Sequence, residues 1–205
     1  KGAFQNTKYI TIRFNSDCQI TEIPSYAFGD DFRKMESCDR EIDCFPQDVR
    51  VIGDHAFSGA DLDFNNHHIN TTVTSLGSFL KNVEEIGAYA FSYCYCGYNA
   101  VEITIPQSCK VIGEGAFSNF RSEVAGISLA NGVERIETKA FQIPNYNVKF
   151  QSVYLPASLT YIADDAFTVN TEFEVELNSY AQRWAERNAY SYKIRGQEDD
   201  LSWLN

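Results

Sequence analysis

The chain has 205 residues, of which 44% are hydrophobic and 22% are charged, and its formal net charge at pH 7 is −11. This composition is typical of a folded soluble protein, and no apolar run approaches the roughly 18 residues that a membrane-spanning helix needs. A phosphate backbone is bound by clustered Lys and Arg, so the acidic balance argues against nucleic acid as a partner.

The N-terminal residues Tyr9 to Phe14 alternate between apolar and polar side chains. Alternation of this kind is typical of a short strand with one buried face. We therefore expect an N-terminal capping strand within residues 1–14 that covers the first of the repeats that follow.

One motif then occurs six times: an isoleucine, an alanine four positions later, and a phenylalanine directly after the alanine. The copies end at Phe28, Phe57, Phe91, Phe117, Phe141 and Phe167, which lie 24 to 34 residues apart. Such a period predicts a repeat protein in which each unit is one short supersecondary element with a loop of variable length. We assign about six repeats to residues 15–171 and expect their phenylalanines to stack into one core.

Two further apolar slots recur within each unit. Pairs of apolar residues separated by one residue predict a short strand seven to nine residues before the motif isoleucine, at Ile103/Ile105, Ile127/Leu129 and Val153/Leu155, with weaker versions at Phe14, Phe45 and Phe79. A single inward position follows at Ile20, Val49, Val83, Cys109, Val133 and Leu159. The motif itself predicts one helical turn that carries its isoleucine and alanine on one face.

The C-terminal residues 172–195 predict a cap of strand, helix and strand. Phe173 to Leu177 alternates as a strand does, and Ser179 with Gln182 has the spacing of a capping box that opens a helix to about Ala189. The apolar stripe of this helix is expected at Tyr180, Ala181, Trp184 and Ala185. Tyr190 to Ile194 predicts a last strand, and residues 196–205 predict a polar tail with an apolar end, so that residues 1–205 form a single domain.

Two stretches, Ile103 to Phe117 and Val153 to Phe167, resemble the BspA-like leucine-rich repeats, and Ser179 to Ala189 looks like the terminal helix that often closes such arrays. The resemblance implies an α/β repeat fold: a right-handed leucine-rich-repeat solenoid with short parallel strands on one face, helical turns and loops on the other, and a C-terminal capping helix. It also implies export to a bacterial surface, adhesion, and binding of host or matrix proteins. It carries over no catalytic residue, because the family motif is structural.

Six cysteines leave two interpretations open: Cys18, Cys38, Cys44, Cys94, Cys96 and Cys109. An even number suits disulfides in an oxidising compartment. Cys94 and Cys109, however, occupy slots where a small buried thiol packs well, which favours free thiols. The Cys94-x-Cys96 spacing is wrong for a zinc site.

The most suggestive binding segment is the insertion at residues 92–99, which contains Tyr93, Tyr95 and Tyr98 among Ser, Gly and Asn. This composition is typical of adaptable binding loops. The alternative, which the general behaviour of tyrosine favours, is that these residues pack on the convex side of the array. A second candidate is the strand face opposite the core. Thr104, Ser128 and Tyr154 occupy equivalent middle positions there, with Ser78 and Cys44 in line, and the alternative is a merely solvated sheet.

Other chemistry has little support in the residues. Asp61 to Asn65 begins like a calcium loop, but Asn66 and Thr72 replace the glycine and glutamate that the loop requires. No nucleophile motif or phosphate-cradling loop is present, so we expect no enzyme, cofactor or metal. The sequence favours a non-enzymatic protein-binding module, extracellular or at the cell surface after loss of a signal segment, with a protein ligand. The alternative is a structural spacer within a larger surface protein.

Overall fold

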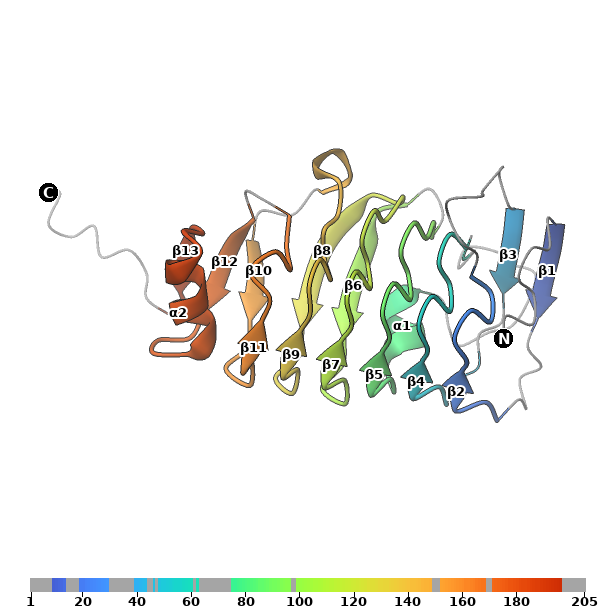
Figure 1. The fold of residues 1–205 in the computed structure, drawn as a ribbon, viewed down its shortest axis with the longest axis horizontal. Coiled ribbons are helices and arrows are strands. Elements are labelled where there is room, and N and C mark those ends of the chain that lie inside the picture. Colours follow the sequence, from blue (N-terminus) through green and yellow to red (C-terminus); the bar gives the residue numbers. More distant parts are fainter. Residues whose placement is uncertain are drawn as a thin grey trace, which may run out of the picture.

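The computed structural model describes residues 9–13, 19–29, 39–43, 46, 48–60, 62, 75–96, 99–148, 152–168 and 171–196. Its elements are β1 Tyr9–Arg13, β2 Glu22–Ile23, β3 Asp39–Asp43, β4 Val51–Ile52, α1 Leu76–Leu80, β5 Glu85–Ile86, β6 Val101–Ile105, β7 Val111–Ile112, β8 Val124–Leu129, β9 Arg135–Ile136, the 3₁₀-helix η2 Asn145–Asn147, β10 Ser152–Leu155, β11 Tyr161–Ile162, β12 Glu172–Val175, α2 Tyr180–Arg187 and β13 Tyr192–Ile194. Figure 1 shows successive repeats side by side, with β1 near one end and α2 at the other.

The motif isoleucines form a six-stranded parallel sheet in the order β2-β4-β5-β7-β9-β11, with each isoleucine in register with the next. Each strand has only two residues. The predicted helical turn was wrong, because in the second to sixth repeats the amide after the motif isoleucine donates to the isoleucine carbonyl of the preceding repeat instead of to a group of its own repeat. Gly53 N donates to Ile23 O at 2.8 Å and Gly87 N to Ile52 O at 2.7 Å, for example.

A tight turn follows each of these strands and leads to the motif alanine. The amide of Ala56 donates to Gly53 O at 3.2 Å, and the same bond recurs in the other repeats. The residue before the alanine has φ between 54 and 60° in five repeats, at Tyr26, His55, Tyr89, Gly115 and Lys139. This left-handed conformation costs a residue with a side chain about 1–2 kcal/mol, so the packing of neighbouring repeats must hold it in place.

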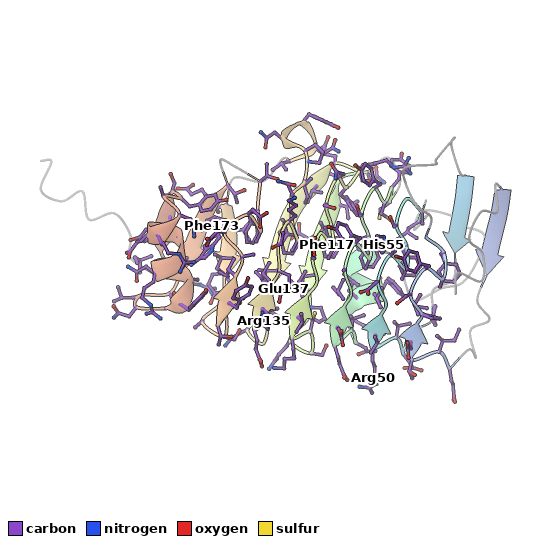
Figure 2. The ribbon with its side chains drawn as sticks, viewed as in Figure 1. Arg50, His55, Phe117, Arg135, Glu137 and Phe173 are labelled. Atoms are coloured by element: carbon purple, nitrogen blue, oxygen red, sulfur yellow. The ribbon has the colours of Figure 1, made fainter. Side chains whose placement is uncertain are left out.

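The motif phenylalanines stack in a single column through the core. Successive rings from Phe28 to Phe167 are parallel within 17°, and their centroids are 5.2–5.4 Å apart. The accompanying isoleucines and alanines are buried. Phe117 lies in the middle of this column (Figure 2). Burial of each such ring contributes on the order of 2 kcal/mol, and the column makes each repeat depend on its neighbours.

Longer strands form a second row, and β6, β8 and β10 confirm the strands predicted at Ile103/Ile105, Ile127/Leu129 and Val153/Leu155. The predicted positions Phe14 and Phe45 lie outside the described residues. β1 pairs with β3, β6 with β8, and β12 lies between β10 and β13, all of them parallel. The third repeat differs, since α1 replaces the strand expected around Phe79. Leu76, Phe79 and Leu80 are buried at helical spacing, and the Ser75–Ser78 capping box opens this helix.

Helix α2 packs against the last repeat. The indole of Trp184 stacks on Tyr190 with centroids 5.1 Å apart and meets Phe173 edge-on at 5.4 Å. Ser179 Oγ accepts the Gln182 amide at 3.0 Å, but Gln182 Oε1 accepts from Asn178 N and not from Ser179. The helix ends at Arg187, before the expected Ala189, whose φ of 56° is left-handed. Of the predicted tail, all but Gly196 lies outside the described residues.

Candidate binding surface

The tyrosine-containing insertion of the third repeat is held by backbone hydrogen bonds. Tyr95 N donates to Ala60 O at 2.9 Å, and Tyr95 O accepts from Leu62 N at 2.7 Å. Tyr93 N donates to Ser118 O in the following repeat at 3.0 Å. Tyr93 and Tyr95 are both half-buried, so part of each is presented at the surface by a fixed backbone. Tyr98 lies outside the described residues.

The corresponding segment of the fourth repeat brings Arg121 beside Tyr95. Arg121 N donates to Cys94 O at 2.9 Å, and the guanidinium carbon lies 5.9 Å from the centroid of the Tyr95 ring. This distance is within the range of a cation–π contact. The Arg121 side chain is exposed, so its hydrogen-bond donors are accessible to a ligand.

The fifth repeat adds the most exposed large hydrophobic side chain among the described residues, Tyr146, which is 80% exposed. It lies in η2, within the gold segment that rises above β8 in Figure 1. Neighbouring Asn147 donates through Nδ2 to Phe120 O at 2.8 Å and through its amide to Pro144 O at 2.8 Å. These bonds place Tyr146 close to the segment that carries Arg121.

We call Tyr93, Tyr95, Arg121 and Tyr146 the insertion rim. Sequence reasoning selected the two tyrosines of the third repeat and missed Arg121 and Tyr146. A signal for Arg121 was present, since it follows Phe117 by four residues, as Tyr95 follows Phe91. Three consecutive repeats thus contribute the aromatic and Arg side chains that dominate binding energy at protein interfaces.

The other predicted site residues lie on the strand face. Thr104 of β6 is in register with Ser128 of β8. Thr104 is half-buried, because α1 passes over it so closely that a side chain at Gly77 would come within 3.2 Å of its Cβ and Oγ1. Ser128 is exposed. On this face α1 therefore covers part of Thr104, whereas Ser128 is open to solvent.

Tyr154 of β10 belongs to a polar cluster at the C-terminal end of the same face. Its hydroxyl donates to Glu176 Oε1 at 2.9 Å, and the guanidinium carbon of Arg195 lies 4.2 Å from its ring centroid. Arg195 also approaches Glu174 at 3.8 Å and Glu176 at 3.9 Å. Burial, followed by the hydrogen bond to Glu176, raises the pKa of Tyr154. The Tyr154 side chain is therefore already engaged by Glu176 and Arg195 of its own chain.

Cys94, Cys96 and Cys109 are buried free thiols, which agrees with the free-thiol interpretation for these three. Cys18, Cys38 and Cys44 lie outside the described residues. Within the described ranges, no three His, Cys, Asp or Glu side chains gather in a group that could hold a metal ion. Across the same part of the chain, no helix combines the length and apolar character needed to cross a membrane.

Comparison with known protein families identifies the class. The model of the BspA type leucine rich repeat region matches residues 1–81 and 84–183 with six copies, so the chain belongs to this family. Its members are typically surface-associated repeat proteins of bacteria without enzymatic activity, and leucine-rich-repeat domains generally mediate protein interactions. No curated protein and no solved structure matched the chain.

Proposed function

We propose that residues 1–205 form a single domain, a right-handed solenoid closed by α2, which acts as a non-enzymatic protein-binding module of adhesin type. The parallel pairing of every repeat with its neighbour supports the solenoid. The aromatic packing of Trp184 on the last repeat supports the capping role of α2. The family supports a place at the bacterial surface or outside the cell.

The observation that carries the proposal is the insertion rim. Its tyrosines and arginine come from three consecutive repeats, and hydrogen bonds between repeats hold the main chain that carries them. A preordered main chain loses less conformational entropy when a ligand binds. Tyr and Arg are enriched among the residues that dominate interface affinity.

The strand face is a weaker candidate, although it keeps three predicted residues. α1 abuts Thr104, and Tyr154 is bound to Glu176 and Arg195. Ser128 alone of the three is exposed. We therefore place the main contact with a protein ligand on the insertion rim. A substitution at Ser128 serves as the control for the strand face.

The test is a binding screen against an array of purified host matrix and serum proteins. The unsubstituted chain, a Tyr95→Ala/Tyr146→Ala double variant and a Ser128→Ala control are compared on the same array. The proposal predicts a captured protein whose signal falls at least about tenfold in the double variant and is unchanged in the control. If the array captures nothing, or if the double variant binds as well as the unsubstituted chain, the role of the rim is refuted and a spacer function is favoured.

A further inference from the structure

We propose that the insertion rim recognises a carboxylate on its protein partner, with Arg121 as the anchoring residue. This inference rests on the proposed function and names the chemistry of the bound segment. The segment places one Asp, Glu or terminal carboxylate against Arg121 and a neutral, preferably aromatic, side chain against Tyr95 or Tyr146.

The charge pairing of the chain singles out Arg121. Most cations of the described residues are already matched with a carboxylate of their own chain, namely Arg50, Lys110, Arg135, Arg187, Lys193 and Arg195. Arg121 forms an ion pair with no described carboxylate, and its side chain is exposed. Lys81, Lys139 and Arg183 are also exposed and form no ion pair with a described carboxylate, but of these four cations only Arg121 lies against a rim tyrosine, Tyr95.

The chemistry of Arg121 suits a planar anion. The five N–H donors of a guanidinium form a planar fork that matches the two oxygens of a carboxylate. The main chain at Tyr95 is fixed by Ala60 and Leu62, and that at Arg121 by Cys94. Because the main chain at both residues is held, only their side chains remain to be ordered when a ligand binds.

The net charge of the chain further restricts the charge that the bound segment can carry. The chain carries −11, so a strongly acidic surface is repelled at long range. The favoured ligand is therefore a neutral or basic segment with a single carboxylate, which approaches the acidic chain easily and is then oriented by Arg121. A phosphate-rich polyanion does not fit this description.

The experiment selects linear peptides from a random library displayed on phage, using the whole chain as bait. Selections are run in parallel with the unsubstituted chain, Arg121→Gln, Arg121→Lys, Tyr146→Ala, and the control Arg183→Gln. Arg183 is an exposed arginine of α2 that donates to Asn178 O. Circular dichroism verifies that each variant is folded.

We expect peptides selected by the unsubstituted chain to be enriched in one acidic residue, or, when the library displays free C-termini, to bind through the terminal carboxylate. Arg121→Gln should weaken their binding on the order of tenfold or more, and Arg121→Lys less. Arg183→Gln should have no effect. Synthetic copies with Asp→Asn, Glu→Gln or an amidated C-terminus then identify the source of the carboxylate.

The experiment distinguishes a failure of the carboxylate inference from a failure of the proposed function. Peptides that lack carboxylates but lose binding in Tyr146→Ala overturn the carboxylate inference and leave the proposed function standing. Equal binding by Arg121→Gln and the unsubstituted chain also overturns it. A selection that yields no peptide, or only peptides insensitive to every rim variant, refutes both the inference and the role of the rim. Enrichment of polyacidic peptides refutes the single-carboxylate ligand.

Discussion

The ring of Tyr89 lies over Gly115 of the next repeat and fills the space that any side chain at Gly115 would occupy. The Tyr89 hydroxyl donates to Glu114, the neighbour of that glycine. This hydrogen bond, together with burial, raises the pKa of Tyr89 to about 12. Tyr89 also stacks on His55, which stacks on Tyr26, so this row of rings joins the first three repeats and ends at the glycine of the fourth.

Gly115→Ala should therefore destabilise the protein by at least about 2 kcal/mol. Alanine at position 115 would have to adopt the left-handed conformation, since φ is +58° there, and its methyl group would displace the Tyr89 ring. Lys139 occupies the same slot in the next repeat with φ 56° and is exposed. Lys139→Gly should leave stability unchanged or raise it by up to about 1 kcal/mol, because strain is relieved at some entropic cost. Urea unfolding of both variants provides the measurement, and shifts of the same sign would contradict the slot assignment.

Phe117→Ala should cost about 3–5 kcal/mol, because it opens a cavity in the middle of the ring column. Phe117 is 0% exposed and stacks on Phe91 and Phe141 at 5.2 and 5.4 Å. Thr104→Ala, on the strand face, should change the free energy of unfolding by less than about 1 kcal/mol. Chemical denaturation compares the two, and equal losses would refute the stacking scheme.

The pH dependence of protein stability tests the burial of the Cys109 thiol. Burial raises the pKa of its thiol from 9.0 to about 12. The folded protein keeps this proton when the unfolded chain has lost it, so the contribution to stability is complete below pH 9 and is lost as the pH rises toward 12. Cys109→Val, which places at this position the residue found at Val83 and Val133, should make the fall in stability above pH 9 shallower.

The measurement is denaturant unfolding of both proteins at a series of pH values from 8 to about 11. Alkylation followed by peptide mapping adds a second readout. Cys94, Cys96 and Cys109 should resist iodoacetamide until the chain is unfolded, since all three are buried. Parallel pH curves for the two proteins, or rapid labelling of native Cys109, would contradict the burial of this thiol.

The ion pairs along the six-stranded sheet should contribute unequally. Arg50 and Glu84 are 2.6 Å apart, but their side chains are 60% and 49% exposed, so Glu84→Gln should cost less than about 0.5 kcal/mol. Arg135 bonds to Glu137 at 2.8 Å, and its guanidinium carbon also lies 4.3 Å from the centroid of the Tyr161 ring. Figure 2 labels Arg50, Arg135 and Glu137. Arg135→Gln should therefore cost more, about 1 kcal/mol. Thermal melts at low and high salt rank the two variants, and the reverse order would refute this account.

Much of the core was predictable from the sequence, because the spacing of Ile, Ala and Phe is a property of each repeat by itself. The two-residue strands were not, since they are defined by hydrogen bonds to a neighbouring repeat that no local pattern records. The helix α1 was overlooked at Phe79, although Leu76, Phe79 and Leu80 have helical spacing. Arg121 and Tyr146 join the rim only through bonds between insertions, such as that from Asn147 to Phe120.

The insertion of the fifth repeat leaves the core after Ile143, which is buried and whose carbonyl accepts a hydrogen bond from Thr168 Oγ1. Its far end returns at Val148, which bridges to Val124 of the preceding repeat. Both anchor points are therefore held by contacts with neighbouring repeats. The entropy of closing such a loop changes only slowly with its length. A foreign peptide can accordingly be grafted between these two anchors, turning the array into a display scaffold whose ring column is left untouched.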